Sequence, residues 1–137
     1  MTELNTEYLE RCLATLEKSY EMIQTTTPET IEYEMYRNSL VKGFEMTLEQ
    51  SGKLLKKKLF PFFASKKALD ILSFKDIFRT AHKHGLLSES AVLRWMQYRD
   101  NRNTTAHDYG VAFAEETLKL MQSFIPDVVY LIKVIQA

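Results

Sequence analysis

The chain has 137 residues and a mass of 16.0 kDa, a size typical of one domain, and its 18 basic residues balance its 18 acidic residues. Its composition of 45% hydrophobic and 26% charged residues is that of a folded globular protein and excludes a disordered chain. Four Gly and three Pro are too few for many hairpins, and the single Cys12 excludes an internal disulfide and a cysteine zinc site, so we expect a helical protein with no metal or other cofactor.

The first two predicted helices are long and are separated by a proline. Apolar residues at steps of three and four predict one helix over residues 5–24 and a second from residue 29 that ends before Pro61. Pro28 disfavours a helical residue before it and leaves Thr27 able to cap the second helix. The first stripe, which makes its cysteine a packed thiol rather than a nucleophile, consists of Leu9, Cys12, Leu13, Leu16, Tyr20 and Ile23. The second consists of Tyr33, Tyr36, Leu40, Phe44, Leu48, Ser51 and Leu55.

The middle of the chain predicts two shorter helices after a linker at residues 60–63. Ser73 and Asp76 form a variant of the capping box and begin a helix that runs to residue 84 and stops at Gly85. Ser88 is expected to cap the next helix. The apolar stripe of that helix starts with Val92, Trp95 and Met96 and continues with the polar residues Arg99, Arg102 and Asn103. The stripe therefore turns polar where a core helix would stay apolar.

The last predicted helix carries an apolar stripe interrupted by a proline. The stripe consists of Leu118, Met121, Ile125, Val128, Ile132 and Ile135. Pro126 predicts a kink or a break near Ser123. With no strand pattern and short joints, the sequence predicts an all-α fold, an antiparallel four-helix bundle with one short extra helix in a single domain over residues 1–137.

The N-terminus has no basic region followed by an apolar run, and no segment approaches the roughly 18 apolar residues of a membrane span. We therefore expect a cytoplasmic protein that does not bind a membrane.

Charge is distributed unevenly along the chain. Residues 1–50 hold ten Glu against four basic residues, whereas residues 51–69 hold six lysines and no acid. The lysines are Lys53, Lys56, Lys57, Lys58, Lys66 and Lys67. They fit best a solvated surface that complements a helix dipole, and the alternative is a patch that steers the phosphates of single-stranded RNA.

The stretch from Arg99 to Tyr109 concentrates the groups that could carry chemistry. His107 can move protons near neutral pH, and Arg102 can hold a phosphate and stabilise its developing charge, so together they suit metal-independent cleavage of a phosphodiester. A helix end that recruits these groups only for capping and ion pairing is the alternative on spacing alone. In a continuous helix the two residues would lie about 140° apart, so they converge best if the helix ends or bends between them.

The motif of Arg102, four residues, His107, one residue and Tyr109 resembles that of the HEPN superfamily, and more closely that of the HepT toxins paired with minimal nucleotidyltransferase antitoxins. The resemblance spans about residues 5–135 and includes Phe44 with Glu45. Further stretches that carry it are Arg37-Asn38, Glu49 with residues 53–56, residues 78–86, Trp95 to Tyr98, and Arg102-Asn103. Ser51 and Gly52 depart from it, since the family tends to have a small residue and an aromatic there.

The resemblance implies a HEPN-like homodimer in which two motifs face one cleft, and a ribonuclease in the toxin members. His107 would be the proton-transfer group, Arg102 the phosphate clamp and Asn103 a positioning donor. A cognate minimal nucleotidyltransferase would silence the toxin by attaching AMP to Tyr109. The alternative is a noncatalytic module that presents a substrate to that nucleotidyltransferase.

Three other sets of residues can be interpreted as structural or as functional. Glu45 and Glu49 share a helix face, and they fit either a solvated or ion-paired edge, such as Glu49 with Lys53, or an acidic partner from Glu45 to Arg102 or His107. His82 and His84 lie on opposite sides of a helix, which disfavours a shared metal. Trp95 and Tyr98 are expected in the core or an interface rather than as platforms for bases.

Overall fold

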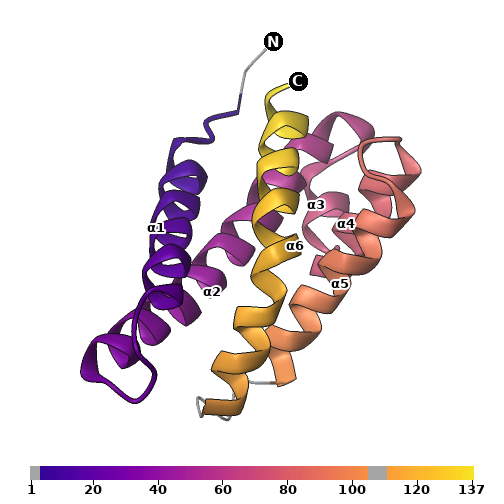
Figure 1. Cartoon of the computed structure of the whole chain (residues 1–137). Helices are drawn as coiled ribbons and strands as arrows, with labels where there is room; N and C mark the ends of the chain where they lie inside the picture. Colours follow the sequence, from indigo (N-terminus) through magenta and orange to yellow (C-terminus); the bar gives the residue numbers. More distant parts are fainter. Residues whose placement is uncertain (1–3, 105–110) are drawn as a thin grey trace.

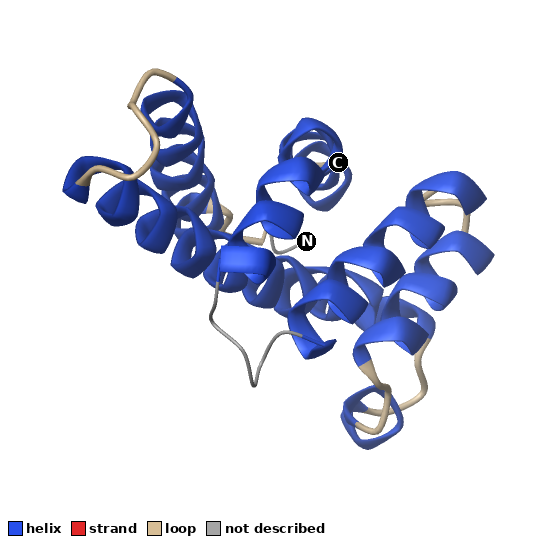
Figure 2. Cartoon of the chain, turned by 60° about the horizontal axis from the view of Figure 1, so that its bottom comes forward, coloured by secondary structure: helices blue, strands red, loops and turns tan. Residues whose placement is uncertain are grey.

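The computed structural model describes residues 4–104 and 111–137, and every regular element in this part of the chain is helical (Figures 1 and 2). In chain order the elements are α1 (Glu7–Gln24), α2 (Ile31–Leu59), a 3-10 turn η1 (Phe60–Phe62), α3 (Lys66–Asp70), α4 (Phe74–Lys83), α5 (Glu89–Thr104) and α6 (Val111–Gln136). The predicted all-α fold is confirmed.

The long helix α2 organises the molecule, because it packs against α1, α4, α5 and α6. Figure 1 shows α1 beside one flank of α2, and α4 and α5 beside the other, with α6 between the two sides. Helices that follow one another through short connections, α1 with α2 and α5 with α6, run antiparallel, whereas α2 and α6 run in the same direction and end close together, where Lys58 donates to the carbonyl oxygen of Ala137. A hydrogen bond from Gln136 Nε2 to Thr6 Oγ1 (2.9 Å) joins the end of α6 to the start of α1. No helix of the described residues combines the length and the apolar character needed to cross a membrane.

The predicted apolar stripes meet in one core, and aromatic rings fill its centre. Five rings from α2, α4, α5 and α6 are fully buried: Phe44, Phe78, Trp95, Tyr98 and Phe124. Ring centroids lie 4.8 Å apart between the first and last of these and 4.8 Å apart between Phe78 and Trp95. The thiol of Cys12 is buried among the apolar residues of α1, as predicted. Trp95 and Tyr98 are therefore core residues.

Local capping signals set several helix ends. Ser73 and Asp76 form the complete predicted capping box of α4. The chain turns after α4 at Gly85, whose φ of +76° is readily adopted only by glycine. Ser88 Oγ accepts the amide of Ala91 (3.2 Å) at the start of α5, as predicted.

Two details of the prediction at helix starts are wrong. The cap of α2 is Thr30 rather than Thr27, because Thr30 Oγ1 accepts the amide of Tyr33 at 3.1 Å, and the helix starts at Ile31. The short helix α3 was not predicted. It is capped by Ser65, whose Oγ accepts the amide of Ala68 at 3.1 Å, but its five residues are too few to show a helical period.

Of the predicted kink or break near Ser123, the break does not occur, since α6 continues through Pro126. Pro126 is exposed, and the carbonyl it leaves without a helical donor belongs to Gln122, which is exposed too. The neighbouring Phe124 and Val128 are fully buried. Packing of these side chains keeps the segment helical, and solvent can reach the unpaired carbonyl.

The contact between α2 and α4 depends on the absence of a side chain at Gly52. A Cβ at this position would lie 2.8 Å from Cε2 of Phe74, whose ring also packs against Phe78 at 4.7 Å. A Cβ at Gly43 would lie 3.3 Å from Leu16 Cδ1, the end of a flexible side chain, and at an ordinary contact distance of 3.5 Å from Cα and Cβ of the same residue. The aromatic ring at this point of the structure thus comes from α4 and excludes one at position 52.

We expect Gly52→Ala to be less stable than Gly43→Ala by about 1–2 kcal/mol. Both substitutions gain the same helix propensity, but only the first forces a ring to move in packed surroundings. Urea unfolding followed by the fluorescence of Trp95 measures the difference. Equal stabilities would show that Phe74 moves aside without cost.

Candidate functional site

The predicted site residues come from α2 and from the end of α5. Arg102 lies in the last turn of α5 and Asn103 follows it with an exposed side chain. Glu45 lies in the middle of α2. His107 and Tyr109 lie outside the described residues. The structure therefore describes the arginine half of the motif and its surroundings.

The carboxylate of Glu45 contacts the guanidinium of Arg102. Glu45 Oε2 lies 3.2 Å from Arg102 Nε, and the two side chains are 14% and 31% exposed. Of the two interpretations of Glu45, the structure thus has the one in which it is a partner of Arg102. The contact at Nε restricts the rotation of the guanidinium. A group that binds a phosphate in one orientation needs such a restriction.

A second ion pair joins the same two helices one turn away. Arg99 Nη1 lies 3.4 Å from Glu49 Oε2, and the guanidinium carbon of Arg99 lies 4.9 Å from the centre of the Phe74 ring. Glu49 therefore pairs with α5 and not, as predicted for a solvated edge, with Lys53. Because α2 and α5 run antiparallel, the two pairs form successive rungs and fix the register between the helices.

Two other helices hold the end of α5 as well. Asn101 Nδ2 donates to Thr117 Oγ1 of α6 at 3.2 Å, and Lys75 Nζ of α4 lies 2.7 Å from Asp100 Oδ1. The residues around Arg102 thus contact α2, α4 and α6 within a few positions. These contacts connect the C-terminal end of α5 to three neighbouring helices.

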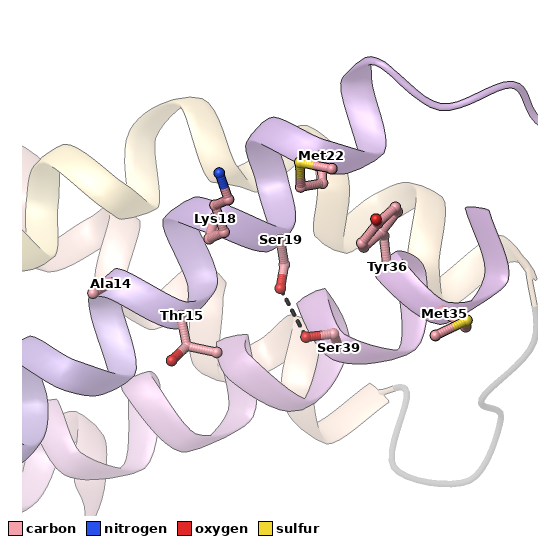
Figure 3. A pocket seen from close by; sticks show the side chains of 8 residues that line it. All are labelled: Ala14, Thr15, Lys18, Ser19, Met22, Met35, Tyr36 and Ser39. Atoms are coloured by element: carbon pink, nitrogen blue, oxygen red, sulfur yellow. Dashed lines mark hydrogen bonds between the residues drawn. The ribbon is translucent and has the colours of Figure 1, made fainter. Parts of the chain in front are cut away.

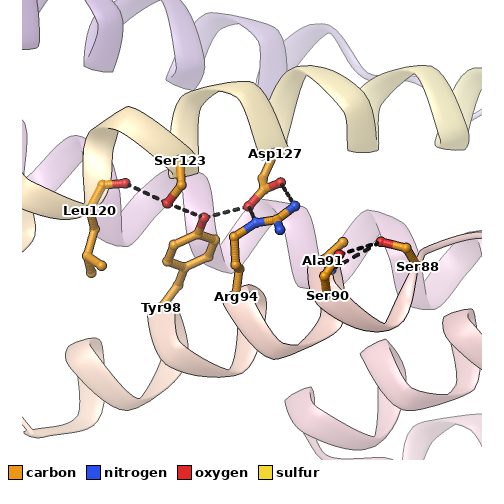
Figure 4. Close-up of polar contacts among 8 residues, drawn as sticks. All are labelled: Ser88, Ser90, Ala91, Arg94, Tyr98, Leu120, Ser123 and Asp127. Atoms are coloured by element: carbon orange, nitrogen blue, oxygen red, sulfur yellow. Dashed lines mark hydrogen bonds and ion pairs between the residues drawn. The ribbon is translucent and has the colours of Figure 1, made fainter.

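A buried polar network that the sequence analysis did not predict joins the first half of α5 to α6 (Figure 4). Asp127 of α6 accepts two hydrogen bonds from Arg94, at 2.9 and 2.8 Å, and another from the hydroxyl of Tyr98, whose oxygen also lies 2.8 Å from Ser123 Oγ. Asp127 is 8% exposed and Tyr98 is fully buried. An acid next to Pro126 on an otherwise apolar stripe was the signal that could have revealed it.

The network raises the pKa values of two of its members, Tyr98 and Arg94. Burial, together with the hydrogen bond to Asp127, raises the pKa of the Tyr98 hydroxyl well above its ordinary value. The hydrogen bonds to Asp127 also raise the pKa of the Arg94 guanidinium. Tyr98 is therefore neutral and Arg94 charged at any physiological pH, which suits a structural network rather than a proton-transfer site.

Other features of the described residues lie apart from the site. A groove of about 570 Å³ between α1 and α2 is crossed by the hydrogen bond between Ser19 and Ser39 (2.7 Å) and contains none of the predicted site residues (Figure 3). His82 Nδ1 lies 2.9 Å from the carbonyl oxygen of Leu87, whereas His84 stacks on Phe62. Within residues 4–104 and 111–137, no three His, Cys, Asp or Glu side chains are grouped so that they could hold a metal ion.

Comparisons with known proteins agree on one family. Residues 4–137 match the family model described as nucleotidyltransferase substrate binding protein like. A curated protein of Haemophilus influenzae named "Probable ribonuclease HepT" is 29% identical over 111 residues, which are 78% of this chain and 75% of that protein.

Solved structures share the fold. A Haemophilus influenzae structure, described as the fold of a substrate binding domain of a nucleotidyltransferase, has a TM-score of 0.80 and 23% identity, with 97% of this chain and all of that chain covered. A Thermus thermophilus crystal structure has a TM-score of 0.72 and 24% identity, with 94% of this chain and 99% of that chain covered.

Proposed function

Because the chain belongs to the nucleotidyltransferase substrate binding protein like family, we propose that it is a HepT-like cytoplasmic protein in which Arg102 and His107 cleave RNA without a metal ion. The observation that carries the proposal is the Arg102 guanidinium in the last turn of α5, which lies 3.2 Å from Glu45 and precedes His107 by five positions in the chain. The similarity to a relative named as a ribonuclease supports the same reaction class.

The proposed residues divide the reaction into proton transfer and charge stabilisation. His107 accepts the proton of the RNA 2′-hydroxyl, whose oxygen attacks the neighbouring phosphorus while the bond to the 5′-oxygen breaks and that oxygen takes up a proton. Arg102 stabilises the negative charge that develops on the phosphoryl oxygens, and Asn103 donates a hydrogen bond that positions the phosphate. Glu45 orients Arg102 and does not touch the substrate.

The test is cleavage of RNA by the purified protein in EDTA. We expect wild type to degrade tRNA or mRNA, His107→Ala to be inactive, and His84→Ala, which changes an exposed histidine stacked on Phe62, to match wild type. RNA that stays intact at micromolar protein without any partner would contradict the nuclease and favour the noncatalytic module that binds a substrate for a nucleotidyltransferase.

The proposed partner is a cognate minimal nucleotidyltransferase that attaches AMP to Tyr109. The tyrosine oxygen attacks the α-phosphorus of ATP and pyrophosphate leaves, and the partner must supply the activation because a tyrosine pKa lies near 10. The added phosphate places negative charge two residues from His107 and repels an RNA phosphate.

Incubation with the partner, ATP and magnesium is expected to add multiples of the adenylate mass to wild type and none to Tyr109→Phe. Mass spectrometry of the intact chain measures this. If Tyr109→Phe is modified as readily as wild type, Tyr109 is not the acceptor, and the nuclease proposal stands or falls separately.

We also propose that the protein acts as a homodimer with both motifs on one cleft. Leu93 of α5 and Val129 and Tyr130 of α6 are exposed by 60%, 38% and 54%, and they adjoin the residues of the Arg94 to Asp127 pair in the chain. We infer that a second copy covers these exposed apolar side chains of α5 and α6. A monomer in light scattering at high protein concentration would contradict the shared cleft.

A further inference from the structure

Four exposed lysines lie around the C-terminal half of α2 and the start of α3: Lys53, Lys57, Lys66 and Lys67, which we call the lysine surface. Residues 51–69 contain no acid. Lys56 is paired with Asp70 at 3.1 Å, which fixes α3 against α2, and Lys58 donates to the carbonyl oxygen of Ala137. In the described part of the chain, none of the four lysines of the surface forms an ion pair.

Compensation of helix dipoles accounts for only part of this charge. Cations stabilise the C-terminal end of a helix and are unfavourable at its start. Lys57 and Lys67 lie in the last turns of α2 and α3, but Lys53 lies one turn before the end of α2 and Lys66 is the first residue of α3. Lys53 and Lys66 therefore serve neither the C-terminal end of a helix nor a carboxylate, and an external anion is the partner that their charge fits.

A groove beside Lys57 has the groups that contact a nucleotide. It lies between α1 and α2, has a volume of about 370 Å³, and is lined by Arg11 and Lys57, by the amide side chains of Asn5 and Gln50, and by Tyr8. Glu7 is the one carboxylate in its lining. The ring of Tyr8 is 51% exposed. Cations contact phosphates, amides contact base edges, and an exposed ring stacks on a base, so the set suits an unpaired nucleotide better than a duplex.

The lysine surface is separate from the candidate site but lies along the same helix. From Glu45 to Lys57 α2 rises about 18 Å at 1.5 Å per residue. A strand that reaches Arg102 can therefore continue along α2 to the lysine surface with nucleotides that take no part in cleavage.

We propose that the lysine surface and the adjoining groove bind the sugar-phosphate backbone and one base of single-stranded RNA outside the cleavage site. This inference rests on the proposed function for its class of substrate. It assigns the affinity for RNA to α1, α2 and α3 and leaves the chemistry to the end of α5.

The test measures binding without cleavage. A fluorescently labelled single-stranded RNA is titrated with full-length His107→Ala protein at several salt concentrations, and anisotropy gives the dissociation constant. In this background we compare three double variants. Two change the lysine surface, one at Lys53→Glu and Lys57→Glu and the other at Lys66→Glu and Lys67→Glu. The third, Lys18→Glu and Lys119→Glu, is the control. Both control lysines are exposed and pair with a glutamate three residues away, and each pair changes the net charge equally. Circular dichroism verifies that all variants are folded.

Each lysine-surface pair is expected to raise the dissociation constant about 10–100-fold at low salt and to reduce the slope of log K against log salt by about 1.4, since two phosphate contacts are lost. Tyr8→Ala is expected to weaken binding about tenfold with the slope unchanged. The control double variant is expected to have nearly the same dissociation constant as the His107→Ala protein.

Equal effects of the surface and control pairs would overturn the proposal, because net charge alone would then explain binding. Unchanged RNA binding together with weaker binding of a nucleotidyltransferase would also overturn it and assign the surface to a protein partner. Cleavage of RNA by wild type is measured separately. The proposal of RNA cleavage and the proposal of RNA binding by the lysine surface can therefore be contradicted independently of each other.

Discussion

Arg102→Ala is expected to lower the rate of RNA cleavage by about 10²–10³-fold, the usual cost of removing one group that stabilises charge in a transition state. Arg102→Lys keeps the charge but loses the planar fork, so it restores only part of the rate. Single-turnover cleavage of a defined RNA measures the chemical step. A rate within about threefold of wild type for Arg102→Ala would remove Arg102 from the proposed mechanism.

The contact between Glu45 and Arg102 leads to a second prediction, which tests whether Glu45 acts through Arg102. Glu45→Gln keeps an acceptor near Arg102 Nε but removes its charge, so we expect a smaller loss, about tenfold, through a less fixed guanidinium. If Glu45 acts only through Arg102, the double variant with Arg102→Ala cleaves no more slowly than Arg102→Ala alone. Glu49→Gln, which changes the neighbouring pair with Arg99, is the matched control and should cleave like wild type. Additive losses in the double variant would show that Glu45 acts independently of Arg102.

Asp127→Ala is expected to lower the free energy of unfolding by about 2–3 kcal/mol. It removes the charged acceptor of the fully buried Tyr98 hydroxyl, which keeps only Ser123 Oγ as a partner, and it removes the carboxylate that holds Arg94. The value lies below that of fully buried pairs because the Arg94 side chain is 40% exposed and can be hydrated. Asp100→Ala, which breaks an exposed pair with Lys75, should cost at most about 1 kcal/mol. Urea unfolding followed by Trp95 fluorescence compares the two, and equal losses would contradict a structural role for the network.

The same network predicts a loss of stability at alkaline pH. The Tyr98 hydroxyl has a raised pKa in the folded protein, whereas in the unfolded chain it titrates near pH 10. The folded state therefore retains a proton that the unfolded state loses, so stability is unaffected below about pH 10 and falls as pH rises above it. Tyr98→Phe should show a weaker decline than wild type between about pH 9 and pH 11 in the urea midpoint. An identical decline would mean that other groups cause it.

The existence of the main helices follows from the sequence alone. Side chains three and four residues apart lie on one face, so the stripe that contains Leu9 and Leu16, and the stripe that contains Phe44 and Leu48, identify helices and their buried faces without knowledge of their partners. The capping box of Ser73 and Asp76 and the turn at Gly85 are equally local, because each depends on backbone groups a few residues away. The motif of Arg102, His107 and Tyr109 is also a property of the sequence, and it is the basis of the proposed reaction.

Tertiary structure decided which helices touch and at which residues. The pairs of Glu45 with Arg102 and of Arg94 with Asp127 join residues far apart in the chain, and each depends on the rotation and register of two packed helices. Helical periodicity determines neither quantity, because it repeats identically for every register. Packing also kept α6 continuous at Pro126, against a local preference for a break, since the buried side chains on either side hold the helix while the exposed carbonyl can be hydrated. The cap of α4 lies within one segment and could be predicted, although the equally local cap of α2 was misplaced, whereas a contact that two helices share could be specified only by the assembled core.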